Sequence, residues 1–119
     1  MEEYKLFDGE YKFVNIIWEL EPINSPELVK VCEDRLGWKK STTYTVLRKL
    51  CQRNVLQNEN TIVTALIKRE QVQKYESEAV LSKAFNGSLP AFIATLLEGK
   101  KLTVKEVNEI KKMIEEAAK

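Results

Sequence analysis

The chain has 119 residues, of which 44% are hydrophobic and 31% charged, and its formal net charge is +1. This composition is typical of a soluble globular protein, and the length predicts one compact domain or a domain with a helical extension. The sequence has no histidine, four isolated glycines and two well-separated cysteines. These features exclude the common catalytic, phosphate-cradling and zinc-binding motifs, so we expect neither an enzyme nor a bound metal or cofactor.

The sequence also lacks the features of a membrane or secreted protein. Its apolar runs are much shorter than the roughly 18 residues that a membrane span requires. The N-terminus, Met1-Glu2-Glu3-Tyr4-Lys5, is acidic and does not resemble a signal peptide. Cys32 and Cys51 lie in apolar-periodic segments, which is typical of buried thiols in a reducing compartment. We therefore expect a cytoplasmic protein with no membrane partner.

Two helices are predicted in the first third of the chain. Asp8 is a suitable N-cap for a helix that ends near Leu20. This helix is apolar around most of its circumference and should be central to the core. Ser25 supplies a capping hydroxyl for a second helix, Pro26 suits its first turn, and Gly37 ends it.

A third helix is predicted from Ser41 to Arg53, where Asn54 can take the left-handed conformation that often follows a helix. At 100° per residue, four side chains form a narrow arc that should face the core: Thr43, Val46, Leu47 and Leu50. The opposite face carries hydroxyls, an amide, an aromatic ring and cations, but no carboxylate: Ser41, Thr42, Tyr44, Thr45, Arg48, Lys49 and Gln52.

Residues 55–66 predict two short strands with a turn at Asn58-Glu59-Asn60. Three more helices follow, over residues 69–85, residues 88–97 and from Thr103 onward, where Thr103 and Glu106 form a capping box. This order predicts a mainly α fold: a winged helix-turn-helix domain over residues 1–67, with three helices and a small hairpin, and a helical dimerisation domain over residues 68–119.

The last helices carry apolar stripes with little core of their own to cover. Seven residues form these stripes: Phe92, Ile93, Leu96, Leu97, Val107, Ile110 and Ile114. We expect them to pack against a second copy of the chain, which would make the protein a homodimer. The alternative is that these helices fold back on the first domain.

Basic residues are concentrated in one segment. Residues 35–58 hold six of the 19 basic residues and no acidic one, which leaves 13 basic and 18 acidic residues elsewhere. A positive segment within an otherwise acidic chain indicates a localised anionic partner, although a solvated helix face with a chance charge balance has the same composition.

Double-stranded DNA fits this segment. A helix with a cationic, hydroxyl-rich outer face can enter the major groove, where Arg48 could pair with guanine and the lysines could bind phosphate. The candidate DNA contacts are Lys39, Lys40, Ser41, Thr42, Tyr44, Thr45, Arg48 and Lys49. For Tyr44, partial burial against the second helix is an equally good interpretation.

Three segments resemble the penicillinase and methicillin-resistance repressors. The first is Gly37-Trp-Lys-Lys-Ser-Thr-Thr-Tyr-Thr-Val-Leu-Arg-Lys-Leu-Cys-Gln-Arg-Asn-Val-Leu56, which is similar to the recognition-helix signature of that family. Val14-Asn-Ile-Ile-Trp-Glu19 is similar to its first helix, and residues 86–110 to its dimerisation end. The resemblance covers nearly the whole chain in order.

The resemblance implies a dimeric winged-helix repressor that binds a palindromic operator and controls β-lactamase or other resistance or stress genes. Penicillinase-type repressors are inactivated by a regulatory protease at an Asn-Phe pair in the helix that aligns with residues 89–97. This chain has Thr95-Leu96 at that position, and its wing segment, Leu56 to Thr61, is short and slightly acidic. The inducing signal therefore stays open.

Two other functions remain open from the sequence. A winged-helix protein–protein adaptor would use the apolar tail for assembly and would not need Arg48 or Lys49. A non-specific architectural protein would bind DNA with a steep dependence on salt but without sequence preference.

Overall fold

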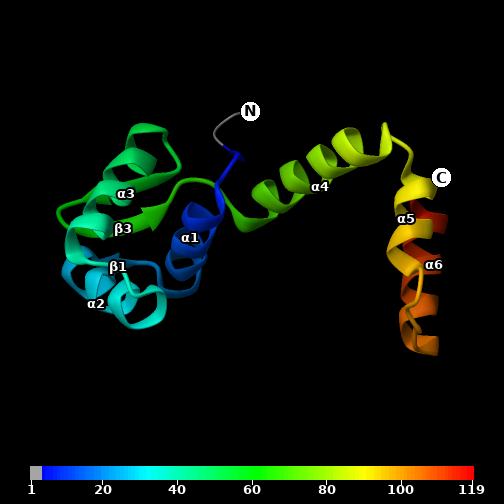
Figure 1. The fold of residues 1–119 in the computed structure, drawn as a ribbon, viewed down its shortest axis with the longest axis horizontal. Coiled ribbons are helices and arrows are strands. Elements are labelled where there is room, and N and C mark those ends of the chain that lie inside the picture. The colour runs from blue at the N-terminus through cyan, green and yellow to red at the C-terminus, as the bar shows by residue number, and fades with distance from the viewer. Residues whose placement is uncertain (1–3) are drawn as a thin grey trace. The chain divides into compact units, whose positions relative to one another are not determined.

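The computed structural model describes residues 4–119, which form two units (Figure 1). The first unit ends at Ala79 and the second spans Val80–Lys119. In the first unit, the elements are α1 (Asp8–Leu20), β1 (Ile23–Asn24), α2 (Ser25–Leu36), α3 (Lys40–Gln52), β2 (Leu56–Glu59), β3 (Ile62–Ala65) and most of α4 (Arg69–Phe85).

The three strands form one antiparallel sheet in the order β1-β3-β2. Ile23 of β1 pairs with Val63, so the chain segment between α1 and α2 becomes an additional strand beside the hairpin. This strand was not predicted from the sequence, because two residues are too few to show the alternation of apolar and polar residues that indicates a strand. Three helices and a small antiparallel sheet, followed by further helices, confirm the predicted winged helix-turn-helix architecture.

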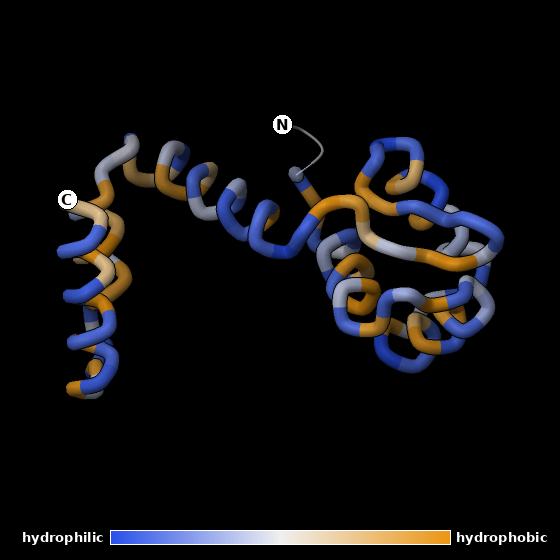
Figure 2. Tube along the Cα trace, turned by 180° about the vertical axis from the view of Figure 1, so that it is seen from behind, coloured by the Kyte–Doolittle hydropathy of each residue, from blue (hydrophilic) through white to orange (hydrophobic). Residues whose placement is uncertain are grey.

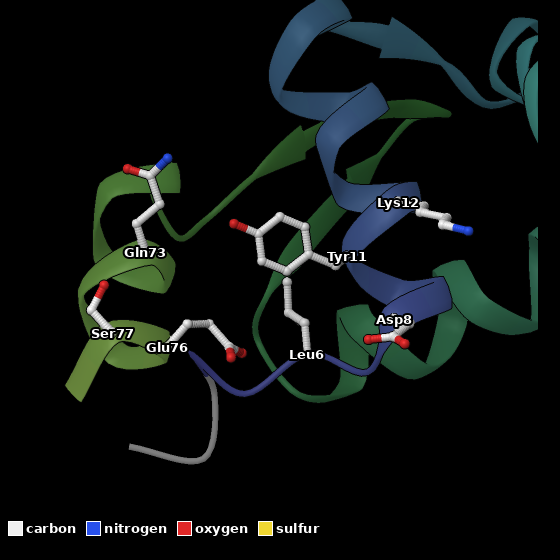
Figure 3. A pocket seen from close by; sticks show the side chains of 7 residues that line it. All are labelled: Leu6, Asp8, Tyr11, Lys12, Gln73, Glu76 and Ser77. Atoms are coloured by element: carbon white, nitrogen blue, oxygen red, sulfur yellow. The ribbon is translucent and has the colours of Figure 1, made fainter. Parts of the chain in front are cut away.

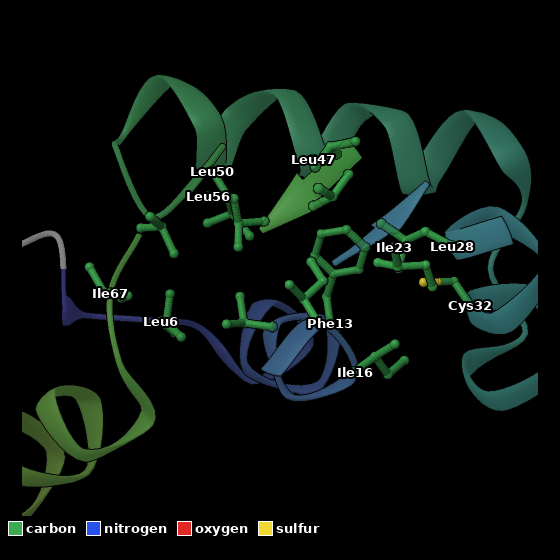
Figure 4. Close-up of a cluster of buried hydrophobic side chains, with 14 of the residues drawn as sticks. Leu6, Phe13, Ile16, Ile23, Leu28, Cys32, Leu47, Leu50, Leu56 and Ile67 are labelled. Atoms are coloured by element: carbon green, nitrogen blue, oxygen red, sulfur yellow. The ribbon is translucent and has the colours of Figure 1, made fainter. Parts of the chain in front are cut away.

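The core of the first unit lies between α1, α2, α3 and the sheet (Figure 4). Phe13, Val14 and Ile17 of α1 are fully buried, as its apolar circumference predicts. Leu47 and Leu50 reach this core from the inner face of α3. Burying side chains of this size stabilises a fold by about 1.5–3 kcal/mol each, so the core fixes α3 with its other face outward.

The N-terminal ends of α1 and α2 differ from the prediction by one residue each. The N-cap of α1 is Phe7, whose backbone N–H donates to Glu10 at 3.0 Å, and Asp8 lies within the first turn. The N-cap of α2 is Asn24, whose side chain accepts a hydrogen bond from the Glu27 N–H at 2.8 Å. Asp8 and Ser25 were therefore wrong as caps. Asn24 provides the same capping oxygen as a serine would.

The hairpin turn also lies further along the chain than predicted. Glu59 pairs with Ile62, so the two turn residues are Asn60 and Thr61, with φ of 53° and 66°. Two successive positive φ values are typical of the tight turn that matches the twist of a hairpin. The predicted turn at residues 58–60 was wrong because Thr61 is β-branched, which normally disfavours this conformation.

The start of α4 belongs to the first unit. Val72 is fully buried, the indole N–H of Trp18 donates to the Ile67 carbonyl at 3.0 Å, and the Arg69 guanidinium lies over the Trp18 ring at 5.4 Å. The sequence predicts a domain boundary between residues 67 and 68. Trp18 contacts Ile67 and Arg69, one on each side of this position. The contacts separate the two units within α4, after Ala79.

The second unit contains the end of α4, α5 (Leu89–Leu97) and α6 (Val104–Ala117). Ser88 caps α5, and Thr103 and Glu106 form the predicted capping box on α6, with hydrogen bonds of 3.0 and 3.1 Å. The Phe85 and Phe92 rings are in contact, with centroids 5.1 Å apart. Apolar residues recur along α5 and α6 (Figure 2), yet none of the residues from Val80 onward is buried.

Within residues 4–119, no single helix has the length and apolar composition of a membrane span, although α4 and α5 reach both together across a sharp bend.

Candidate nucleic-acid interface

The inner face of helix α3 is buried and packs against the core of the first unit. Thr43, Leu47 and Leu50 are nearly inaccessible, and Val46 is half-buried. This confirms the predicted arc and shows that Thr43 cannot contact a base. Trp38, just before the helix, stacks on the Phe13 ring of α1 with centroids 5.5 Å apart. The start of α3 is therefore anchored to the core.

The outer face of α3 is exposed to solvent. Seven of the eight candidate contacts are exposed: Lys39, Lys40, Ser41, Thr42, Thr45, Arg48 and Lys49. Tyr44 is half-buried and packs against the core, which favours the second interpretation of this residue. The structure thus brings the seven exposed candidates together at the N-terminus and on the outer face of α3.

The N-terminus of α3 is open. Its N-cap, Lys39, makes no capping hydrogen bond through its side chain, and the first turn contains no acidic residue. In contrast, side chains accept hydrogen bonds from the first turns of α2, α5 and α6. The free N–H groups at the start of a helix, together with the helix dipole, favour an anion such as phosphate. Lys39 and Lys40 add two cations at the same place.

Ion pairing divides the six cations of the basic segment into two groups. Arg35 pairs with Glu19 at 2.6 Å, and Arg53 pairs with Glu10 at 3.1 Å, so carboxylates of α1 compensate both arginines. The hydrogen bond from Arg35 lowers the pKa of Glu19, which keeps its charge over a wider pH range. Within residues 4–119 the other four cations form no ion pair: Lys39, Lys40, Arg48 and Lys49.

The wing, which is the hairpin of β2 and β3, lies beside the second half of α3. A hollow of about 330 Å³ lies where the two meet and is lined by Tyr44, Leu47, Arg48, Cys51 and Asn58. Burial raises the pKa of the Cys51 thiol, and a backbone hydrogen bond from Asn58 partly offsets this effect. The thiol is therefore predominantly protonated at neutral pH and a weak nucleophile.

The wing itself offers no cation. Residues 56–65 contain Glu59 and neither lysine nor arginine, and the Glu59 carboxylate accepts a hydrogen bond from the Gln57 amide at 2.6 Å. A wing of this composition can contact DNA only through amides, hydroxyls and backbone groups. The positive charge of this surface is carried by α3.

The other thiol is internal. Cys32 is fully buried at the contact between α2 and α3, next to Thr43. Burial raises the pKa of the Cys32 thiol, and the Thr43 hydroxyl partly opposes this shift. Both cysteines are free, but only Cys32 is fully buried as expected, whereas Cys51 is half-buried.

The candidate dimer residues lie in the second unit. Phe92, Ile93 and Val107 are half-buried within it, whereas four are exposed: Leu96 by 47%, Leu97 by 38%, Ile110 by 37% and Ile114 by 57%. The candidate cleavage pair, Thr95 and Leu96, lies within α5, where both residues are exposed.

A further hollow lies beside α1. The hollow in Figure 3, about 560 Å³, lies between the start of α1 and α4, with Tyr11 and Leu6 at its floor and charged side chains such as Glu76 at its rim. Among the described residues, no group of three histidine, cysteine, aspartate or glutamate side chains could hold a metal ion.

Glu10 and Asn58 contribute to the surroundings of α3 but were not predicted from the sequence. Glu10 lies 43 residues from Arg53, its partner, and no local pattern connects them. Two of the six cations in residues 35–58 are compensated by carboxylates from outside this segment. The uncompensated positive charge in the folded chain is therefore smaller than the sequence indicates.

Comparison with known proteins gives two findings. A family model described as penicillinase repressor matches residues 7–116 of the chain. A penicillinase repressor of Bacillus licheniformis is 25% identical over 116 residues, which cover 94% of this chain and 91% of that protein. The matched region includes α1, the whole winged-helix part and most of the C-terminal helices.

Proposed function

Because the chain belongs to the penicillinase repressor family, we propose that it is a homodimeric transcriptional repressor that recognises a palindromic DNA operator through α3. One observation carries this proposal. The four cations of the basic segment that form no ion pair within residues 4–119 all lie at the start of α3 or on its exposed face, beside an uncapped helix N-terminus.

The candidate contacts have two roles in this proposal. Lys39, Lys40 and the free N–H groups of the first turn bind phosphate and position α3 along the groove. Arg48 lies further along the exposed face, where its guanidinium can form two hydrogen bonds with a guanine edge. The hydroxyls of Ser41, Thr42 and Thr45 and the ammonium of Lys49 complete the contact surface, whereas the half-buried Tyr44 packs against the core behind it.

A second copy of the chain is part of the proposal. The exposed stripes on α5 and α6 pair with the same stripes of the second copy, which removes their apolar surface from water. The dimer then presents two copies of α3 to two half-sites, and the spacing between the half-sites follows from the dimer. Repression by blocking a promoter requires no catalysis, cofactor or membrane.

The proposed target genes follow from the relative. The Bacillus licheniformis protein is a penicillinase repressor. We propose that the target is a β-lactamase gene or another resistance or stress gene. We also propose that the protein acts in the cytoplasm. If a regulatory protease acts on Thr95-Leu96, α5 must first unwind locally, because both residues are helical.

Selection of bound sites from a random duplex pool at near-physiological salt tests the proposal. The expected result is an inverted repeat with one fixed half-site spacing. Binding without a consensus would indicate an architectural DNA-binding protein, and no binding by a folded dimer would indicate a protein–protein adaptor. Either result would overturn operator recognition.

Two substitutions then separate the roles within α3. Arg48→Ala should cost about 1–3 kcal/mol for the selected operator and relax preference at one base pair. Lys40→Ala should weaken selected and random DNA alike and reduce the salt dependence. Equal losses on both kinds of DNA for both variants would contradict this division.

A further inference from the structure

Arg53 follows the last residue of α3 and is bound to the start of α1. Its Nη1 donates to both carboxylate oxygens of Glu10, at 3.1 and 3.2 Å, and its Nη2 donates to the Lys5 carbonyl. The side chains of Arg53 and Glu10 are 33% and 16% exposed. Arg53 is therefore engaged within the protein, although it lies in the basic segment.

Glu10 is itself held in place. Its Oε1 accepts a hydrogen bond from the Phe7 N–H at 3.0 Å, which closes the N-terminal end of α1. One carboxylate thus joins the first turn of α1 to the residue after α3. Because the cap fixes this carboxylate, Arg53 binds a pre-oriented partner, and little side-chain freedom is lost when the contact forms.

The other end of α3 also depends on α1. Trp38, which precedes Lys40 by two residues, stacks on Phe13 with an angle of 23° between the rings. Helix α1 therefore holds α3 at both ends, through ring stacking at the start and through a charged hydrogen-bond pair at the end. A side chain that reads a base edge must be positioned to about 0.5 Å, so tilting of α3 at either end would misalign it.

We propose that Arg53 is a positioning residue for the DNA-reading helix. Through Glu10 and Lys5 it fixes the C-terminal end of α3, and it acts on the choice of DNA sequence rather than on phosphate affinity. This inference rests on the proposed function, because it requires that α3 reads DNA.

The decisive variant changes the geometry without changing the charge. In Glu10→Gln/Arg53→Gln, one acid and one base are lost together, so the net charge of +1 is kept. Glutamine at position 10 can still accept the hydrogen bond from Phe7, because Gln serves in a capping box as Glu does. A loss of operator affinity that random duplex does not share then reports on the position of α3.

The chain also offers a matched control. Glu19→Gln/Arg35→Gln removes the other ion pair of the basic segment, which joins α1 to α2 and does not involve α3. For each protein we would measure the affinity for the selected operator and for random duplex over a range of salt concentrations. A thermal melt establishes that each variant is folded at the assay temperature.

The expected result is a loss of about tenfold for the operator in Glu10→Gln/Arg53→Gln, which is comparable to one poorly made base contact. Its affinity for random duplex and its salt slope should match the wild type, and the control should bind both DNAs as the wild type does. Arg53→Lys, which keeps the charge but not the two-nitrogen contact, should show the same selective loss to a smaller degree.

Two results would overturn the inference. Equal losses on operator and random duplex with a shallower salt slope would make Arg53 a phosphate contact. Operator affinity equal to wild type in both the double variant and Arg53→Lys would leave it a role in stability alone. Failure of the wild type to select any sequence would instead overturn the proposed function, before any variant is measured.

Discussion

The first unit buries its apolar side chains in a core of its own, whereas the second unit leaves most of them at the surface. Phe13 and Ile17 of α1 are inaccessible to solvent, but Ile114 of α6 is 57% exposed and Met113 is 64% exposed. Both helices have the apolar period of an amphipathic helix. The comparison shows that apolar helix residues can be buried in one region and exposed in another. Under the proposed function, the exposed residues of the second unit serve association with a second copy of the chain.

The largest expected effect tests the core of the first unit. Phe13→Ala removes a fully buried ring and should lower the free energy of unfolding by about 3–5 kcal/mol. The loss should not depend on protein concentration, because every contact is within one chain. Phe92→Ala is the matched variant in the second unit, and its cost should depend on concentration because a second copy supplies contacts in the proposed dimer. Denaturant titrations at two concentrations a hundredfold apart check this, and the reverse dependence would contradict the comparison.

The next effect concerns assembly. Leu96→Asp with Ile114→Asp places two carboxylates on the exposed stripes and should convert the proposed dimer to a monomer. Operator affinity should fall by about a hundredfold or more, because the second half-site no longer binds as part of the same molecule.

Lys112→Asp is the control for that experiment. It introduces the same carboxylate into α6, about 160° around the helix from Ile114. Sedimentation velocity should show a dimer for this control and a monomer for the double variant. A double variant that stays dimeric would place the interface elsewhere.

A smaller effect is expected in the wing. Thr61 has a φ of 66°, and glycine at this position would remove the steric cost of a β-branched residue in the left-handed region. Thr61→Gly should therefore raise the stability of the first unit by about 1 kcal/mol. Asn60→Gly should gain less, because asparagine tolerates the same conformation better. Thermal unfolding measures both, and a destabilised Thr61→Gly would show that the threonine side chain has a favourable contact.

The smallest effect is a pH dependence confined to the second unit. Hydrogen bonds from the Thr103 backbone and hydroxyl lower the pKa of Glu106 below its ordinary value of 4.5. The charged carboxylate is thus favoured in the folded state, so its stabilising contribution is complete above pH 4.5 and is lost as the pH falls through the lowered pKa. Glu106→Gln should lack this contribution, so circular dichroism of wild type and variant should converge in acid. Parallel curves from pH 7 to pH 3 would contradict it.

The fold could be predicted from the sequence where the pattern that determines an element lies within that element. The arc of Thr43, Leu47 and Leu50 predicted the orientation of α3, and Thr103 with Glu106 predicted the start of α6. The strand at Ile23 and the cap at Asn24 were missed, because a strand of two residues depends on its partner Val63 rather than on its own pattern.

The sequence predicted which residues lie in the candidate site, but not which of its cations are compensated by ion pairs. Counting residues treats Arg35 and Arg53 like the four other cations of the segment. The fold distinguishes them by bringing Glu19 and Glu10 within hydrogen-bond distance from 16 and 43 residues away. Such pairs depend on how α1 crosses α2 and α3, which a linear pattern does not contain.

Lys39 also has a consequence for how such a protein could be altered. Helices α2, α5 and α6 have Asn24, Ser88 and Thr103 as N-caps, and an Asp or Ser in place of Lys39 would add about 1 kcal/mol of helix stability to α3. A laboratory selection for heat resistance alone would thus enrich these residues at position 39 and recover proteins that bind anions less well. Under the proposed function, selection for DNA binding would restore the lysine, so the N-cap of α3 would exchange helix stability for anion binding.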